Sequence, residues 1–396
     1  MTQATARPDL AARPLTAAGP AARPGALVLA DGRVFRGLGF GAATTVVGEV
    51  VFNTSMTGYQ EIVTDPSYTG QLVCLTVSEV GNVGVNADDE ESREHGCAGL
   101  IVRALSPVVS NWRSQQDLSG YLARKGLPGL AEVDTRALTR HLRDRGAIMA
   151  ALSSEHDDVE KLLALARSAP SMEGQDLTGR VTTGKTYAWD QPSWEHAAPP
   201  ADVHVVVWDY GIKLSILRRL RDAGARVTVV PASTPASAVL AMRPDGILLS
   251  NGPGDPAAAT AVIAELRALL AAQGLPPVFG VCLGHQLLAL ALGGRTFKMK
   301  FGHHGGNHPV RHEDSKKVAI TSQNHGFAVD LESLGAGATL THLNLFDRTC
   351  AGLRVRGRPI GSVQYHPEAG PGPNDATDLL ANFVAQVRRL RRERAE

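Results

Sequence analysis

The sequence has few cysteines and no excess of charge of either sign. Its four cysteines, Cys74, Cys97, Cys282 and Cys350, are widely spaced and form no C-x-x-C pair. This pattern argues against a disulfide framework and against a thiolate zinc site, and it indicates a reducing compartment. The 40 Lys and Arg residues balance 39 Asp and Glu residues, so the chain has no electrostatic basis for binding nucleic acid or a membrane surface.

Long apolar runs are also missing from the sequence. No stretch reaches the length of a transmembrane helix. Residues 1–24 lack the unbroken apolar core of a secretory signal, and their prolines would interrupt the amphipathic helix of an organellar transit peptide. We therefore expect a loose tail on a cytoplasmic protein that carries out metabolic chemistry.

The length indicates two domains, because 396 residues exceed the usual size of one compact domain. The segment 186–202 is poor in large aliphatic residues and rich in Pro and Trp, which predicts a linker. It separates an N-terminal domain, residues 25–185, from a C-terminal domain, residues 203–390.

The N-terminal domain is predicted to be mixed α/β. Asp31-Gly32 separates two apolar runs, a pattern typical of a β-hairpin. A helix is expected between Asp134, as its N-cap, and Gly146, as its terminator, with leucines along one face.

The C-terminal domain alternates short apolar runs with helical segments, which predicts a doubly wound, mostly parallel sheet covered on both faces. The expected strands are residues 203–209, 226–231, 246–252 and 277–281, and the expected helices are residues 213–224, 236–242 and 261–274. Ligands of such sheets bind beyond the carboxyl ends of the strands. The loop 250–255 and the turn at Cys282 should therefore face one crevice.

Cys282 has the surroundings of a nucleophile. Gly280-Val281-Cys282-Leu283-Gly284 has the layout of a nucleophile elbow with sulfur in place of oxygen. The glycines permit a sharp turn, so we expect the thiol to be exposed at the N-terminus of a helix, which favours a thiolate. A core cysteine in a glycine-containing turn is the alternative.

A general base is suggested by His366-Pro367-Glu368. The residue before a proline favours extended geometry, in which positions i and i+2 point to the same side. Glu368 can then hold one imidazole nitrogen of His366 while the other faces Cys282, as in a catalytic triad.

With these motifs the C-terminal half resembles a class I glutamine amidotransferase, with a flavodoxin-like fold, and the whole chain resembles the family of small, glutamine-hydrolysing subunits of carbamoyl phosphate synthetase. The resemblance covers about residues 25–390. The matching stretches are "GEVVFNTSMTGYQEIVTDPSYTGQ", "GNVGVNADDEES", "SNGPGDP", "PVFGVCLGHQLLALALGG", "KMKFGHHGGNHPV", "SQNHGFAVD" and "QYHPEA".

The resemblance implies residue roles. Cys282 would attack glutamine, His366 would relay the proton to the departing ammonia, and Glu368 would orient His366. Backbone amides of Leu283 and Gly252 would hold the oxyanion. The family's glutamine-contact positions are Ser67, Gly252, Gly254, Leu283, Gln286, Asn324, Gly326 and Phe327. Since Ser67 belongs to the N-terminal domain, the interface between the domains should help to close the pocket.

The resemblance also implies a partner. A large subunit would receive the ammonia and make carbamoyl phosphate from bicarbonate and ATP, for pyrimidine and arginine synthesis. ATP and magnesium are expected on that subunit, and this chain is expected to bind no metal or cofactor. The alternatives are an amidotransferase subunit of another synthetase, a stand-alone glutaminase or thiol amidase, a thiol peptidase and a non-catalytic docking subunit.

Other motifs favour structural roles. The stretch 179–186, "GRVTTGKT", matches a phosphate-loop spacing but lacks a strand before it and a helix after it. A loop lining the active-site region is expected for 301–314, in preference to a metal site formed by its histidines, which are His303, His304, His308 and His312. Asn324-His325-Gly326 predicts a turn in which His325 is structural. Residues 378–396 predict an amphipathic helix with a solvated basic face.

Overall fold

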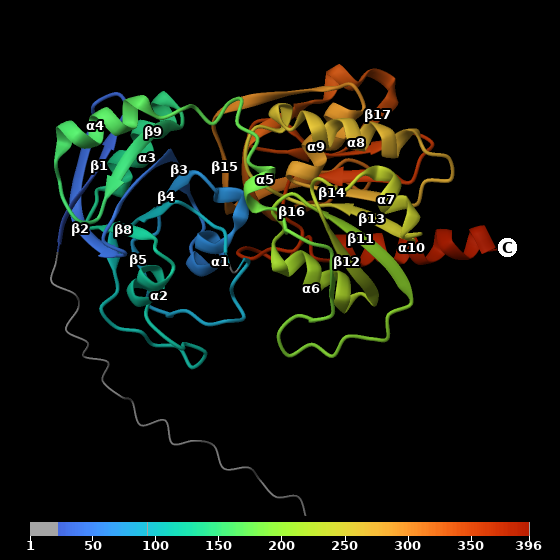
Figure 1. Cartoon of the computed structure of the whole chain (residues 1–396), viewed down its shortest axis with the longest axis horizontal. Helices are drawn as coiled ribbons and strands as arrows, with labels where there is room; N and C mark the ends of the chain where they lie inside the picture. Colours follow the sequence, from blue (N-terminus) through green and yellow to red (C-terminus); the bar gives the residue numbers. More distant parts are fainter. Residues whose placement is uncertain (1–22, 93, 396) are drawn as a thin grey trace, which may run out of the picture.

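The computed structural model describes residues 23–92 and 94–395. It has two parts, a β-barrel built from the first half of the chain and a large sheet with helices built from the second half (Figure 1). The tail predicted over residues 1–24 lies outside the described residues, apart from Arg23 and Pro24, which begin the first strand.

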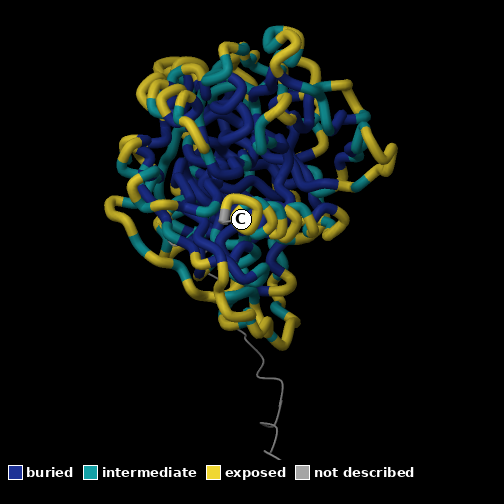
Figure 2. The backbone as a smooth tube through the Cα atoms, turned by 90° about the vertical axis from the view of Figure 1, so that its right-hand side faces the viewer, coloured by how far each residue is buried: buried dark blue, intermediate teal, exposed yellow. Residues whose placement is uncertain are grey.

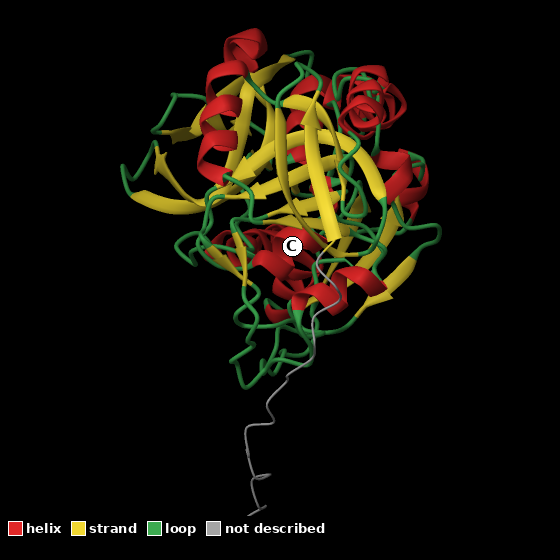
Figure 3. Cartoon of the chain, turned by 90° about the vertical axis from the view of Figure 1, so that its left-hand side faces the viewer, coloured by secondary structure: helices red, strands yellow, loops and turns green. Residues whose placement is uncertain are grey.

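Seven strands of the N-terminal half close into a barrel (Figure 3). In spatial order they are β1 (Arg23–Leu29), β2 (Val34–Gly41), β8 (Pro128–Ala131), β6 (Gly99–Ile101), β4 (Gln71–Leu75), β3 (Thr45–Asn53) and β9 (Ile148–Ser153). A short pair, β5 (Glu79–Val80) and β7 (Ala104–Leu105), lies apart from the barrel. The helical segments are α1 (Tyr59–Thr64), the 3-10 helix η1 (Pro66–Tyr68), α2 (Leu118–Arg124), α3 (Thr135–Arg145) and α4 (Val159–Ser168).

The two local predictions for this half are confirmed. Strands β1 and β2 form an antiparallel hairpin, and Gly32 has the positive φ of 93° that its turn requires. Helix α3 begins after Asp134, whose side chain accepts a hydrogen bond from the backbone N–H of Ala137, and ends at Gly146 with φ 100°. Its apolar face is buried against β-strands of the barrel, which fixes the helix to the domain.

The C-terminal half forms a ten-stranded sheet. In spatial order its strands are β10 (Tyr187–Trp189), β12 (Ala225–Pro231), β11 (Val203–Asp209), β13 (Gly246–Leu249), β14 (Val278–Val281), β19 (Ile360–Val363), β18 (Cys350–Val355), β17 (Ala338–Asn344), β15 (Arg295–His312) and β16 (Val318–Asp330). The five strands from β12 to β19 are parallel in the flavodoxin-like order 2-1-3-4-5. This confirms the predicted parallel sheet and its four expected strands, whereas β19 was not among them.

Helices cover both faces of the parallel strands, because successive strand residues point to opposite sides. On one face Val206 and Trp208 of β11 pack with α7 (Ala236–Ala241), α8 (Thr260–Ala271) and α9 (Leu283–Ala291). On the other face Val205 and Val207 pack with α6 (Leu214–Asp222) and α10 (Asp378–Ala395). The carboxyl ends of β11, β13, β14 and β19 are thereby held together at one edge.

The antiparallel strands beyond β19 were not predicted. Two expectations are wrong here, because the histidine-rich segment lies mostly in β15 instead of a loop, and Asn324-His325-Gly326 lies within β16 instead of a turn. The two long strands pair with each other over most of their length, and this ladder outweighs the local turn preferences of Gly and Asn. The glycines instead accompany two register shifts, where Gly302 has φ 71°.

The predicted linker contributes an edge strand, since β10 pairs antiparallel with β12. The neighbouring stretch 179–186 begins within the short helix α5 (Thr178–Val181) and ends directly before β10. It therefore lacks the strand-loop-helix frame of a phosphate loop, as expected.

The C-terminal helix α10 is amphipathic, as predicted. Leu380, Phe383, Val384 and Val387 pack on the sheet and α6, while its arginines lie toward solvent. Figure 2 shows the exposed end of α10 in front of the buried core. Among the described residues, no helix combines the length and apolarity needed to cross a bilayer.

Strand β15 joins the two halves. Its Lys300 carbonyl accepts a hydrogen bond from the N–H of Ala147 at 2.8 Å, and its His304 carbonyl accepts one from the N–H of Thr54 at 3.1 Å. The barrel is thus fixed against the edge where the parallel strands end.

The N-cap of α3 provides a test of the fold. Asp134→Ala removes the acceptor that lies 2.9 Å from the Ala137 N–H. We expect the free energy of unfolding in urea to fall by about 1 kcal/mol. Asp144→Ala, an exposed acid of the same helix that pairs only with its neighbour Arg143, is the control and should change it by less than about 0.5 kcal/mol. Equal losses in both variants would contradict the assigned cap.

Candidate active site

Cys282 lies on a strained turn between β14 and α9, with φ 53° and ψ −104°. Both flanking glycines are required by close packing. A Cβ at Gly280 would lie 2.7 Å from the carbonyl oxygen of Gly284, and one at Gly284 would lie 2.3 Å from the carbonyl oxygen of Leu249. The elbow predicted from the sequence is therefore present.

The prediction that the thiol is exposed is wrong, because Cys282 is only 2% exposed. The barrel and β16 cover the end of the sheet where the thiol lies. Its Sγ is 3.4 Å from the carbonyl oxygen of Asn324 and 3.8 Å from Nε2 of Gln364. Water is thus largely excluded from the sulfur, which strengthens the electrostatic interactions around it.

His366 and Glu368 form the expected pair. The imidazole Nδ1 lies 2.7 Å from Oε1 of Glu368, and both residues are buried. Burial opposes a charged imidazole, but the Glu368 carboxylate and Cys282 outweigh it and raise the pKa of His366 to about 10. Nε2 of His366 has no hydrogen-bond partner among the described side chains. That nitrogen is therefore available for a proton transfer.

Lys213 completes the charge balance, and the sequence reasoning missed it. Its Nζ lies 2.9 Å from the same Oε1 of Glu368 and also donates to the carbonyl oxygen of Ala369. Burial alone would raise the pKa of Glu368, but Lys213 and His366 lower it to about 2. The available signal was position, since Lys213 follows the carboxyl end of β11, the edge at which a sheet of this kind binds ligands.

A second residue that was not predicted is an acid from the N-terminal half. Glu91 is 1% exposed, and its carboxylate accepts hydrogen bonds from the backbone N–H and the hydroxyl of Ser215. Burial raises the pKa of Glu91, while the charge of Lys213 opposes that rise. Two buried carboxylates from different halves of the chain therefore balance one buried ammonium group. Glu91 lies in the matching stretch "GNVGVNADDEES", which was the signal available.

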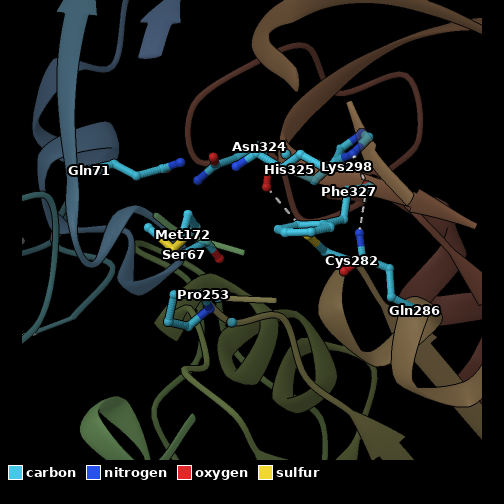
Figure 4. A pocket seen from close by; sticks show the side chains of 13 residues that line it. Ser67, Gln71, Met172, Pro253, Cys282, Gln286, Lys298, Asn324, His325 and Phe327 are labelled. Atoms are coloured by element: carbon cyan, nitrogen blue, oxygen red, sulfur yellow. Dashed lines mark hydrogen bonds between the residues drawn. The ribbon is translucent and has the colours of Figure 1, made fainter. Parts of the chain in front are cut away.

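The pocket beside Cys282 brings most predicted contact residues together (Figure 4). Of those predictions, the pocket contains Ser67, Gly252, Gly254, Gln286, Asn324, Gly326 and Phe327. Leu283 contributes differently, because as the first residue of α9 its backbone N–H has no acceptor within the helix. Lining residues that were not predicted are Gln71, Met172, Pro253 and Lys298.

Both halves of the chain form the walls of this pocket, as predicted. The Asn324 side chain donates to Asp65 at 2.8 Å, and the Asn251 side chain donates to the hydroxyl of Ser67 at 2.9 Å. The cavity has a volume of about 30 Å³, which is roughly the room that one water molecule occupies. Entry of a larger ligand requires lining side chains to move apart.

The loop after β13 passes close to the elbow. A Cβ at Gly252 would lie 2.1 Å from the carbonyl oxygen of Tyr210 and 2.8 Å from a side-chain carbon of Leu283. Only glycine therefore fits there, and its backbone lies beside the start of α9. Two backbone N–H groups next to a nucleophile form a suitable site for an oxyanion.

The other candidates have structural roles. His325 is buried and bonded through Nδ1 to the carbonyl oxygen of Phe327 and through Nε2 to the side chain of Gln323. Among the described residues, no group of three or more His, Cys, Asp and Glu side chains is placed to hold a metal ion. Burial raises the pKa of Cys74, Cys97 and Cys350 to about 12, which makes these thiols poor nucleophiles.

Comparisons with known proteins agree with this geometry. The family model described as carbamoyl-phosphate synthase small chain, CPSase domain, matches residues 27–152, and the model described as glutamine amidotransferase class-I matches residues 206–387. A carbamoyl phosphate synthase small chain from Chlorobaculum tepidum is 52% identical over 368 residues, which cover 93% of this chain and 99% of that protein. This chain belongs to the carbamoyl phosphate synthase small chain family.

Further small chains of this family show the same extent of similarity. The protein from a Synechococcus strain is 53% identical over 367 residues, covering 91% of this chain and 93% of the relative. The protein from Salmonella typhimurium is 50% identical over 374 residues, covering 92% and 97%. The similarity therefore includes both the barrel and the amidotransferase half of this family member.

The buried ion pair provides a test in this small chain. Lys213→Met leaves Glu368 without its cation, and breaking a buried pair costs about 3–5 kcal/mol of unfolding free energy. In the wild type the pKa of Glu368 is held at about 2 instead of 4.5. The stability that the ion pair contributes is therefore present above pH 4.5 and is lost as the pH falls toward 2. Denaturant unfolding at neutral and acidic pH measures both effects.

Lys185→Met, which removes an exposed lysine, is the matched control for Lys213→Met. It should leave the unfolding free energy unchanged. The double variant Lys213→Met with Glu368→Gln should recover part of the loss, because no uncompensated carboxylate is left at position 368. If Lys213→Met is as stable as the control, the ion pair does not hold the site together.

Proposed function

We propose that this chain hydrolyses L-glutamine with Cys282, His366 and Glu368 and supplies the ammonia to a large synthetase subunit. The observation that supports this most strongly is a buried Cys-His-Glu arrangement at a strand–helix elbow, in a pocket between two domains. The same chain is about half identical to carbamoyl phosphate synthase small chains over nearly its whole length.

In the first step the Cys282 thiolate attacks the side-chain amide carbon of glutamine. The carbonyl oxygen becomes an oxyanion, which the backbone N–H groups of Leu283 and Gly252 stabilise, an effect of about 10²–10³-fold for one such donor. The His366 imidazolium then donates its Nε2 proton to the amide nitrogen, the C–N bond breaks, and ammonia leaves. The product is a glutamyl thioester on Cys282.

In the second step water replaces the ammonia. Neutral His366 accepts a proton from the water as it attacks the thioester carbon, and the C–S bond breaks to release glutamate and the thiolate. Glu368 keeps the imidazole oriented and stabilises its charged form throughout. A positioned acid–base of this kind contributes about 10²–10⁴-fold.

The fate of the ammonia belongs to the same proposal. The large subunit would receive it and form carbamoyl phosphate from bicarbonate and ATP, with magnesium and ATP bound on that subunit and no cofactor or metal in this chain. Free ammonia is protonated in neutral water and loses its nucleophilicity, which favours direct transfer. The cytoplasm is the proposed location, because all four cysteines are free and buried, as a reducing compartment permits.

The nucleophile is tested by Cys282→Ser. We expect glutamate release from glutamine to fall to background, because a serine hydroxyl here lacks the nucleophilicity of a thiolate. Glutamine binding, measured by calorimetry, should persist. Cys350→Ser is the matched control, and it should retain activity. Turnover of Cys282→Ser near the wild-type rate would remove Cys282 from the mechanism, and wild-type hydrolysis of peptides in place of glutamine would favour a thiol peptidase.

The acid is tested by the pH dependence of kcat. The imidazolium of His366 must be present in the first step, so activity should decline only as the pH rises through its pKa of about 10. Glu368→Gln removes a carboxylate that raises this pKa, so the alkaline limb should move to lower pH and kcat should fall. Glu90→Gln, which changes an acid bonded to Tyr121 instead, should leave the limb in place. If the alkaline decline of kcat occurs at the same pH in Glu368→Gln as in the wild type, Glu368 does not raise the pKa of the catalytic acid.

A further inference from the structure

A second cavity, of about 460 Å³, lies beside α3 on the barrel. It shares no lining residue with the pocket at Cys282. Its lining consists entirely of hydroxyl and guanidinium side chains, which are Thr76, Thr135, Arg136, Thr139, Arg140 and Arg143. The described lining residues thus include no acid to balance three positive charges.

The arginines of this cavity are arranged unfavourably for the isolated helix. Arg136 and Arg140 are four residues apart and Arg143 is three further on, so the three charges lie along one face, where like charges repel. Arg136 also lies in the first turn, where the helix dipole disfavours a cation. Neither Arg136 nor Arg140 makes an ion pair or a side-chain hydrogen bond with any described residue.

The nearby acids do not remedy this. The Asp134 carboxylate accepts a hydrogen bond from the backbone N–H of Ala137 and so caps the helix instead of pairing with an arginine. Asp144 pairs with Arg143 at 3.1 Å, but both side chains are exposed and adjacent in sequence, a contact that contributes little. The positive charge along α3 therefore remains largely uncompensated within the described part of the chain.

The threonines of the lining differ in what their hydroxyl groups offer to a ligand. Thr135 is 5% exposed, and its hydroxyl makes no hydrogen bond with a described residue. The buried hydroxyl of Thr139 lies beside the thiol of Cys74 in the barrel core, so it does not face the cavity. A polar group without a partner is unfavourable at a largely buried residue such as Thr135. Thr135 lines the same cavity as three arginines, whose guanidinium groups need oxygen acceptors.

We propose that this cavity, the α3 anion site, binds the phosphate group of a small phosphorylated metabolite. Three guanidinium groups and the hydroxyl of Thr135 belong to the lining of one cavity, and this number of donors suits a dianion with four oxygens better than a carboxylate with two. The volume exceeds that of a phosphate alone and lies within the range of roughly 300–1,000 Å³ of small-molecule sites. The cavity therefore has room for an organic part of the ligand in addition to its phosphate.

The test is calorimetric titration of the full chain with inorganic phosphate at low ionic strength. The wild type should bind one phosphate saturably. Arg136→Gln with Arg140→Gln should weaken this binding at least about 10-fold, and Thr135→Val, which removes only the hydroxyl, should weaken it by about 10-fold, as expected for hydrogen bonds to a charged group. Arg124→Gln with Arg145→Gln, two exposed arginines outside the cavity, removes the same charge and should bind like the wild type.

Any of three results would overturn the α3 anion site. One is that the wild type binds no phosphate saturably, and another is that the site variants bind phosphate as tightly as the wild type does. The third is an equal loss of phosphate affinity in the charge-matched control, which would show attraction by net charge alone. If the double arginine variant does not fold, the nearly isosteric Thr135→Val decides. Cys282→Ser should retain phosphate binding, so this test is independent of the proposed glutamine hydrolysis.

Discussion

One carboxylate oxygen links the parts of the proposed catalytic site. Oε1 of Glu368 lies 2.7 Å from Nδ1 of His366 and 2.9 Å from Nζ of Lys213, and all three groups are buried. A buried charge is tolerable only when it is paired and hydrogen-bonded. Lys213 makes it possible to keep a carboxylate ionised in this place, and the ionised carboxylate is what favours the charged imidazole. The orientation and the acidity of His366 thus depend on a lysine that touches neither the thiol nor the pocket beside it.

This requirement explains why the barrel and the sheet act as one unit. Lys213 is balanced by Glu91 as well as by Glu368, and Glu91 comes from the barrel half of the chain. The barrel also supplies Ser67 and Gln71 to the pocket, and β15 is bonded to it through backbone groups. An amidotransferase sheet alone would leave the ammonium of Lys213 and the elbow at Cys282 partly in water. The first half of the chain therefore completes the electrostatics of a site whose proposed reacting groups all come from the second half.

Local signals in the sequence were sufficient for the parts of the structure that depend on local chemistry. The hairpin at Asp31-Gly32, the capped helix α3, four of the five parallel strands and the His366–Glu368 pair each follow from residue type and spacing within a short segment. The burial of Cys282 did not follow, because it results from packing between residues distant in sequence. The same is true of Lys213, whose partner Glu368 lies 155 residues away, and of Glu91, whose partner Ser215 lies 124 residues away. Strands β15 and β16 were missed because their pairing overrides the turn preferences of the glycines and asparagines they contain.

The proposed mechanism requires Cys282 to carry a glutamyl group during turnover. This requirement is tested most directly by mixing the protein with glutamine, quenching in acid within the first turnovers, and mapping the digested peptides by mass spectrometry. We expect a glutamyl adduct on the peptide containing Cys282, and none on those containing Cys74, Cys97 or Cys350. Ammonia release without any adduct on Cys282, or an adduct on another cysteine, would contradict it.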